Sequence, residues 1–169
     1  GWRKMLSLLA APSFSLGGFV KAGHIEKFFR EQFGQKTFDD LKIPFVAVAT
    51  DLNTGREVRI KNGYLIKAVA ASISLPVIFA PVKLQNSLLA DGGLVNPVPD
   101  NVVREMGANI VIAVNLLGDY LPQSYSKNKR KGPFFRLLSV IDKSGGILQA
   151  RLAHHYLKEA DVVIAPKLN

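Results

Sequence analysis

Residues 43–50 read IPFVAVAT, a short and nearly continuous apolar run that is rich in β-branched side chains. Such a run predicts a strand covered on both faces. Residues 51–55 (DLNTG) then supply turn chemistry, and residues 56–61 alternate charged with apolar side chains. This alternation predicts a half-exposed strand that pairs back on the first as a hairpin.

Helices and further strands are predicted on both sides of this hairpin. An aromatic stripe at helical spacing runs through residues 23–33, and Gly34 is placed to end that helix in a left-handed cap. Helical spacing returns at residues 64–71 and is broken by Pro76. Two further strands are predicted at 77–84 and 87–90, around a turn at Gln85-Asn86. A short helix follows, capped by Asp100 and ended by Gly107. The remaining predicted elements are a buried strand at 109–116 (NIVIAVNL), a helix at 133–158 with a weak point at Gly145-Gly146, and a strand at 160–166.

Buried strands that alternate with helices indicate an α/β fold with a mainly parallel central sheet and flanking helices. The sequence shows no internal repeat and no low-complexity tract, so a single domain over residues 1–169 is expected. Hydrophobic residues make up 48% and charged residues 21%, an ordinary globular mixture that can supply a core.

The charge of the chain favours acidic partners without choosing among them. Lys and Arg exceed Asp and Glu by nine, and residues 127–131 (KNKRK) form the one compact basic run. Both a solvated loop and a peripheral contact with an anionic membrane surface remain open for that run, whereas nucleic acid is not expected as a partner. The absence of cysteine excludes disulfides, thiolate metal sites and cysteine nucleophiles.

Two segments could be mistaken for membrane signals. Residues 2–11 have the basic and apolar order of a signal peptide, but the apolar run is short and no initiator Met precedes it. We read them as helix inside a longer protein. Residues 68–82 are free of charge, but they are fewer than the roughly 18 that a span needs and contain Pro76 and Pro81. No transmembrane helix is predicted, and a cytoplasmic or peripheral membrane location is expected.

Asp91-Gly92-Gly93 follows the predicted strand 87–90. Functional groups of α/β sheets gather at the carboxyl ends of strands, so a carboxylate at this position is a candidate catalytic group. The two glycines allow a sharp turn and remove bulk beside the carboxylate. Taken alone, however, Asp-Gly is a common turn signal, and the motif alone favours a structural turn.

Four longer stretches of sequence favour a catalytic interpretation of Asp91 over a structural turn. They are ASISLPVIFAP at 71–81, LADGGLVNPVP at 89–99, FVAVATDLNTG at 45–55 and GANIVIAV at 107–114. The first two stretches occur in the expected order, and over most of the chain the sequence resembles the patatin-like phospholipases and acyl hydrolases, closest to their bacterial branch. The resemblance implies a fold related to the α/β/α sandwich hydrolases and a serine hydrolase that degrades phospholipid or other lipid carboxylic esters.

The resemblance also implies a Ser-Asp dyad, in which a serine on a Gly-x-Ser-x-Gly elbow attacks the ester and an aspartate accepts its proton. The aspartate maps onto Asp91, and Gly92 and Gly93 complete the motif. Neither Gly-x-Ser-x-Gly nor Gly-x-Gly-x-x-Gly occurs in the 169 residues. We therefore expect a partial domain over 1–169 that is incomplete at its N-terminus, lacks the nucleophile and is inactive alone.

Four other polar residues have a structural and a functional reading. Ser72 and Ser74 lack flanking glycines, which favours hydroxyls that satisfy local backbone groups over nucleophiles. Asp51 follows a buried strand, where forming the turn is the favoured role. Asn96 precedes Pro97 and is a candidate for orienting the Asp91 loop through a hydrogen bond to its backbone.

The histidines do not suggest a metal site or a triad. Neighbours on a helix point about 100° apart, so His154 and His155 cannot face one ligand together. His24 has no partner in the sequence and is given no role. No cluster of ligands implies a metal or an organic cofactor.

Two other classes of function were weighed against the hydrolase. A non-catalytic α/β binding or regulatory module would use the basic surface on anionic lipid or protein partners. A nucleotide-binding domain is disfavoured, because no glycine-rich phosphate loop joins a strand to a helix. The oligomeric state, the acyl chain and the head group are left open by the sequence.

Overall fold

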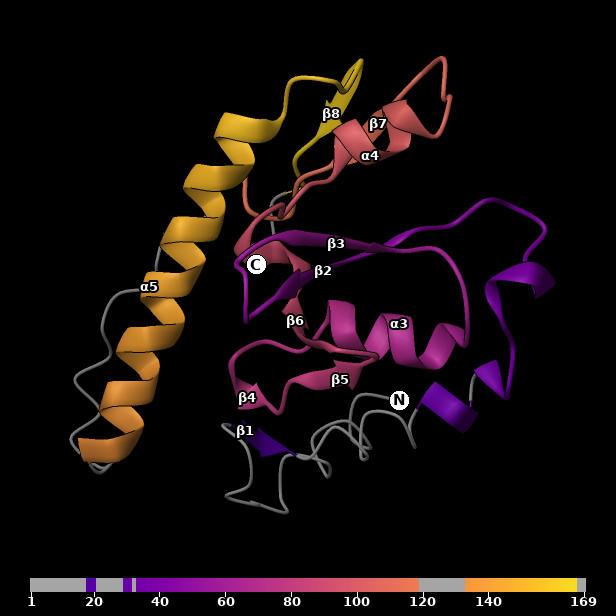
Figure 1. Cartoon of the computed structure of the whole chain (residues 1–169). Coiled ribbons are helices and arrows are strands. Elements are labelled where there is room, and N and C mark those ends of the chain that lie inside the picture. The colour runs from indigo at the N-terminus through magenta and orange to yellow at the C-terminus, as the bar shows by residue number, and fades with distance from the viewer. Residues whose placement is uncertain (1–17, 21–28, 32, 119–132, 167–169) are drawn as a thin grey trace. The chain divides into compact units, whose positions relative to one another are not determined.

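The computed structural model describes residues 18–20, 29–31, 33–118 and 133–166, shown as ribbons in Figure 1. The chain divides into two compact units, Gly1–Gly92 and Gly93–Asn169. Each unit combines helix with sheet and has its own hydrophobic cluster. The predicted α/β class is therefore confirmed.

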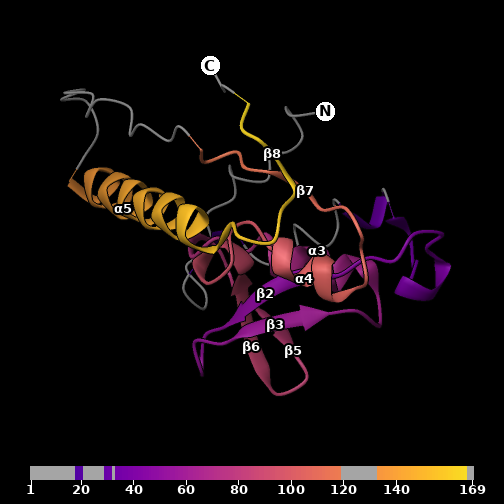
Figure 2. The same cartoon turned by 90° about the horizontal axis from the view of Figure 1, so that it is seen from above.

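The first unit is built on a four-stranded sheet with the order β3-β2-β6-β5. Its strands are β2 (Ala47–Asp51), β3 (Glu57–Ile60), β5 (Val82–Leu84) and β6 (Ser87–Asp91). Strand β6 pairs with both β2 and β5, so it is an inner strand of the sheet. Figure 2 shows the sheet from above, with β2 and β3 side by side.

The predicted hairpin is confirmed, but its first strand begins at Ala47 and not at residue 43, and Ile43 and Phe45 are exposed. All five residues of β2 are buried, as an apolar run covered on both faces requires, whereas β3 is half-buried except at its buried end. The two strands are antiparallel, with Ala49 opposite Val58.

Helix α3 (Leu65–Ser72) packs against this sheet and completes the core. It begins after Tyr64, and Pro76, which cannot donate a backbone hydrogen bond, follows its end. A separate parallel pair joins β1 (Gly18–Val20) to β4 (Val77–Phe79). The buried core of the unit consists of Phe38, Ala47, Ala49, Ile60, Leu65, Ala68, Ala70, Ala71, Val82 and Leu89.

The expected parallel sheet is only partly found. The four-stranded sheet is antiparallel throughout, and the parallel pairs in the described ranges are β1 with β4 and β7 (Ile112–Val114) with β8 (Val162–Ile164). For the consecutive strands β5 and β6, the reason is the length of the connection. A two-residue turn joins β5 to β6, and tight turns join antiparallel neighbours, whereas parallel strands need a long crossover.

The predicted strand 77–84 is likewise two strands. Ala80 and Pro81 separate β4 from β5, because a proline lacks the N–H that would continue a ladder of hydrogen bonds.

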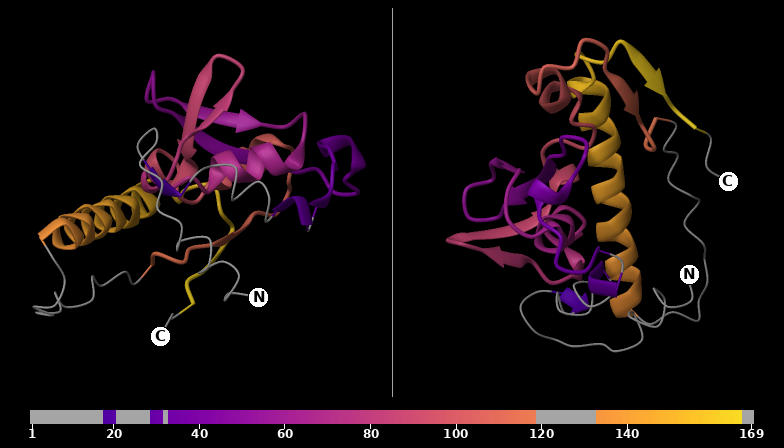
Figure 3. Two further views of the ribbon diagram at one scale, coloured as in Figure 1. Left: turned by 90° about the horizontal axis from the view of Figure 1, so that it is seen from below. Right: turned by 90° about the vertical axis from the view of Figure 1, so that its right-hand side faces the viewer.

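The second unit contains α4 (Asp100–Glu105), α5 (Pro133–Tyr156) and the parallel pair β7 and β8. Figure 3 shows α5 as one long helix and β7 beside β8. The helix runs without a break through Gly145-Gly146, the predicted weak point. The buried cluster of the second unit consists of Val98, Ala113 and Ala153, and Leu157 and Ala160 pack against it.

Two details of this unit correct the predictions. The strand at 109–116 is shorter and is buried on one face only, since Ala113 is buried while Ile112 and Val114 are exposed. Asp100 is the first residue of α4 rather than its cap, because its carboxylate accepts hydrogen bonds from other segments.

Two glycines have the predicted roles at helix ends. Gly34 has a φ of +60°, and its N–H donates to the carbonyl of Arg30. Gly107, after α4, has a φ of +94°. Both values lie in the left-handed region that favours glycine. The rest of the predicted helix 23–33 lies largely outside the described residues.

A short 3-10 helix, η1 (Phe38–Asp40), precedes the sheet of the first unit. None of the helices within the described ranges is long and apolar enough to span a membrane.

Candidate functional site

Asp91 is the last residue of β6, at the carboxyl end of the strand. Leu89 and Ala90, which precede it, have no exposed surface, and Asp91 itself is half-buried. The chain then turns into the 3-10 helix η2 (Gly92–Leu94). The buried strand β6 therefore ends at Asp91, which pairs with Ala49 in the middle of β2.

The backbone of Asp91 is held on both sides of its Cα. Its N–H donates to the carbonyl of Ser74, at 2.9 Å, and its carbonyl accepts from the hydroxyl Oγ1 of Thr50, at 2.8 Å. Thr50 lies on β2 opposite Ala90 and is only 4% exposed. Because both backbone polar groups of Asp91 are hydrogen-bonded, the direction of its Cα–Cβ bond is defined by the sheet.

Gly92 is needed for close packing. A Cβ at this position would lie 2.3 Å from the carbonyl oxygen of Val48 and 2.7 Å from its carbonyl carbon. Since Gly92 is buried against backbone, no flexible side chain can give way. The motif glycine therefore allows the start of η2 to approach strand β2 closely.

Ser74, which precedes the Pro76 turn, makes a local backbone contact. Ser74 has no exposed surface, and its Oγ donates to the carbonyl of Ala70 at 2.6 Å, near the end of α3. Its own carbonyl accepts from Asp91. Ser72 is half-buried as the last residue of α3. For Ser74, the predicted role of satisfying a local backbone group is confirmed.

Asp51 forms the turn after β2. Its Oδ1 accepts from the N–H of Asn53 at 3.0 Å, and its Oδ2 accepts from the hydroxyls of Thr54 and Ser87 at 3.2 and 3.3 Å. These contacts are those of a turn-forming aspartate, so the favoured reading of Asp51 is confirmed.

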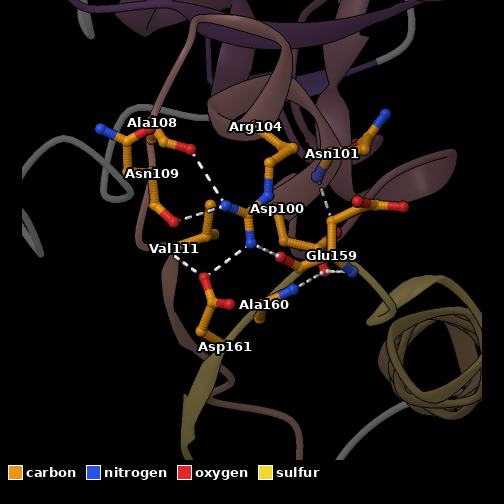
Figure 4. A network of polar contacts seen from close by, with 9 residues as sticks. All are labelled: Asp100, Asn101, Arg104, Ala108, Asn109, Val111, Glu159, Ala160 and Asp161. Carbon is orange, nitrogen blue, oxygen red and sulfur yellow. Dashed lines mark hydrogen bonds and ion pairs between the residues drawn. The ribbon is translucent and has the colours of Figure 1, made fainter.

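A second polar cluster lies in the second unit and is drawn in Figure 4. The carboxylate of Asp100, which is 3% exposed, accepts from the backbone N–H groups of Asn101, Glu159 and Ala160 at 2.8, 2.8 and 3.0 Å. It thereby joins the start of α4 to the segment that leads into β8.

Arg104 of α4 completes this cluster. Its guanidinium donates to the carbonyls of Ala108, Asn109 and Glu159, and to Oδ2 of Asp161 at 2.6 Å. The N–H of Val111 donates to the same Oδ2 at 2.7 Å. That N–H, and then the guanidinium, hold the pKa of Asp161 below its ordinary value. Because the hydrogen bonds of Asp100, Arg104 and Asp161 join parts of the protein to one another, we interpret the cluster as structural.

The structure describes the surroundings of Asn96 without testing its predicted role. Asn96 is buried, and its Nδ2 donates to Oδ1 of Asn101 at 2.9 Å. The hydrogen bond expected toward the Asp91 loop stays a prediction.

His154 and His155 make local contacts within the second unit. The ring nitrogen Nε2 of His154 lies 3.3 Å from the carbonyl of Gly118, and His155 packs edge-on against Tyr156. In the described part of the chain, no three histidine or carboxylate side chains gather as metal ligands would. His24 and the basic run 127–131 lie outside the described residues.

Comparison with known proteins shows the family to which the chain belongs. Residues 2–102 match the sequence model of the family described as patatin-like phospholipase, a stretch that includes Asp91 and its partners Thr50 and Ser74. The chain belongs to the patatin-like phospholipase family. The resemblance inferred from the four sequence stretches is thereby confirmed.

Relatives within and near this family differ greatly in length from the chain. An NTE family protein of Mycobacterium bovis is 40% identical over 116 residues, which are 69% of this chain and 32% of that protein. A patatin-like phospholipase domain-containing protein of Caenorhabditis elegans is 32% identical over 166 residues, 90% of this chain and 12% of that protein. The chain thus spans about a third or less of these relatives.

One contact of the candidate site is not predicted from the sequence. Thr50 was read as the end of an apolar strand, yet its hydroxyl bonds the carbonyl of Asp91, 41 positions away. The available signal was a polar residue at the end of an otherwise apolar run, since a buried hydroxyl needs a hydrogen-bond partner.

Proposed function

We propose that this chain supplies the general base of a hydrolase that cleaves carboxylic esters of phospholipids or related lipids. Asp91 is the base, and a serine on a Gly-x-Ser-x-Gly elbow is the nucleophile. The proposal is carried by one observation, the position of Asp91 at the carboxyl end of an inner strand, with its backbone bonded on both sides. Membership of the patatin-like family supports the reaction class.

The chemistry balances with this single carboxylate. Asp91 accepts the proton of the serine hydroxyl while the serine Oγ bonds to the ester carbonyl carbon. The proton then passes to the leaving alcohol as the ester bond breaks, which leaves an acyl-serine. Water then attacks the acyl-serine while Asp91 accepts a proton from the water. The proton passes to the serine Oγ, and the fatty acid and the free serine are released.

The other members of the motif have supporting roles in the proposal. Gly92 brings the Asp91 turn against the carbonyl of Val48, a close approach that a side chain would prevent. Gly93 follows it at the start of the second unit and leaves room beside the carboxylate. Asn96 is proposed to orient the same loop.

The test uses the polypeptide of the complete reading frame that encodes this chain. Asp91→Asn is expected to lower kcat on a short-chain ester and on phospholipid vesicles by about 10²–10⁴-fold, the usual contribution of a positioned base. Asp39→Asn, which alters an exposed carboxylate of the same unit, is the control and should keep its rate. A complete reading frame without Gly-x-Ser-x-Gly, or full activity in Asp91→Asn, would refute the proposal.

The 169 residues alone are expected to hydrolyse no ester, because they contain no Gly-x-Ser-x-Gly. A measurable rate from this chain that survives further purification would show that another residue is the nucleophile.

Contact with an anionic membrane surface is part of the same proposal, and it is supported by the net charge of +9. Sedimentation with vesicles that contain phosphatidylserine should exceed sedimentation with neutral vesicles and should weaken as salt is added. Equal sedimentation with both kinds of vesicle would exclude this contact.

A further inference from the structure

We infer that Thr50 is a positioning residue for Asp91, one that sets the direction of the general base without touching the substrate. This inference rests on the proposed function of Asp91. It concerns a side chain on a different strand, β2, whose hydroxyl meets the carbonyl of Asp91 at 2.8 Å.

The geometry restrains the peptide that follows Asp91. A peptide unit is planar, so holding the carbonyl oxygen of Asp91 also orients the N–H of Gly92 and the start of η2. On the other side of the same peptide, Gly92 lies against the carbonyl of Val48, two residues before Thr50 on β2. Strand β2 therefore holds the Asp91–Gly92 peptide at two points, one polar and one steric.

The N–H of Asp91 is held independently by the carbonyl of Ser74. That contact involves a backbone carbonyl, which any residue at position 74 would supply. The contact from position 50 depends on a side-chain hydroxyl, which only serine or threonine would place there. Thr50 is therefore the member of the arrangement that a substitution can test.

A general base must lie within hydrogen-bond reach of the proton that it takes, and a misplacement of about 1 Å can cost roughly 10²-fold in rate. Thr50 is buried, so no solvent replaces its hydroxyl without rearrangement. Loss of the hydroxyl should free the Asp91–Gly92 peptide to rotate and should move the carboxylate from its working position. Substrate binding, which does not involve Thr50, should be spared.

The experiment compares Thr50→Val with Thr50→Ser in the polypeptide of the complete reading frame, on a soluble ester. Valine keeps the shape of threonine and removes the hydroxyl, whereas serine keeps the hydroxyl. Thr54→Val is the matched control, because it removes a nearby hydroxyl that bonds Asp51 instead of Asp91. Rates are divided by the folded fraction measured by circular dichroism, and Asp91→Asn is assayed beside them.

Thr50→Val is expected to lower kcat by about 10–100-fold with KM within about threefold, and Thr50→Ser should restore most of the rate. If valine prevents folding, Thr50→Ala takes its place, because it removes the hydroxyl without placing a methyl group against the carbonyl. Unchanged kcat without the hydroxyl, or a loss that serine does not restore, would overturn the role of Thr50. Full activity in Asp91→Asn would overturn the proposed function as well.

Discussion

Gly92 lies so close to β2 that a single added carbon atom would overlap the carbonyl of Val48, 2.3 Å away. The residue after Asp91 is thus constrained by packing, while Asp91 itself is constrained by hydrogen bonds from Thr50 and to Ser74. At the scale of single residues, the Asp91-Gly92-Gly93 motif attaches the carboxylate of Asp91 to a backbone that cannot easily move. These constraints are separable by mutation.

Gly92→Ala is expected to lower the free energy of unfolding by about 1–3 kcal/mol, the usual cost of overpacking against a rigid neighbour. Chemical denaturation monitored by circular dichroism measures this change. An alanine variant as stable as the parent would contradict the close approach on which the interpretation of Gly92 depends.

At the scale of elements, what the sequence predicts depends on the range of the interactions. The hairpin of β2 with β3 and the helix α3 follow from local periodicity and turn residues, and both are found, although β2 begins four residues later than expected. The direction of β6 beside β2 is a long-range property, and the antiparallel pairing differs from the expected parallel sheet. Burial also depends on contacts with distant parts of the chain, so the sequence does not predict that β7 is exposed on one face.

Helix α5 offers the matching test of an unconstrained glycine. A Cβ added at Gly145 would meet nothing within 4 Å, and the helix runs through this position unbroken. Gly145→Ala should therefore stabilise the helix by roughly 0.5–1 kcal/mol through the reduced entropy of the unfolded chain.

The same denaturation series measures Gly145→Ala and Gly92→Ala side by side, with opposite signs expected. Destabilisation by Gly145→Ala would mean that α5 has a closer neighbour at this position than the structure shows.

For the whole molecule, some features of the structure can be predicted from the sequence and others cannot. Asp91 is identified by its motif and by the stretches around it. The partner on β2 and the link from Arg104 to Asp161 join positions 41 and 57 residues apart, and no local pattern predicts such pairs. The chain folds into two compact units, and the second depends on buried and charge-assisted hydrogen bonds to Asp100 and Asp161.

The stability of the second unit should therefore depend on pH in a defined direction. The N–H of Val111 and the Arg104 guanidinium hold the pKa of Asp161 in the folded chain below its value in the unfolded chain. A depressed carboxyl pKa stabilises the fold above the unfolded pKa of about 3.9, and this contribution is lost as pH falls through the folded pKa.

Urea unfolding between about pH 6 and pH 2.5 tests this dependence. Asp161→Asn should be less stable than the parent near neutral pH, and the difference should shrink toward the acid end. Asp142→Asn, at an exposed carboxylate of α5, is the control. The pKa of Asp40 is also lowered, by the backbone N–H and then the hydroxyl of Thr37, so only the difference between parent and variant isolates Asp161. A constant difference across this range would contradict the assignment.

The central claim is that Asp91 activates a serine, and the most direct measurement of it is the rate of covalent labelling by a fluorophosphonate. In the polypeptide of the complete reading frame, mass spectrometry should find one serine labelled, in a Gly-x-Ser-x-Gly sequence, with a rate that saturates with reagent. Asp91→Asn should slow that labelling by about 10²-fold or more, because the hydroxyl loses its proton acceptor. Equal labelling rates in the parent and in Asp91→Asn would contradict the account.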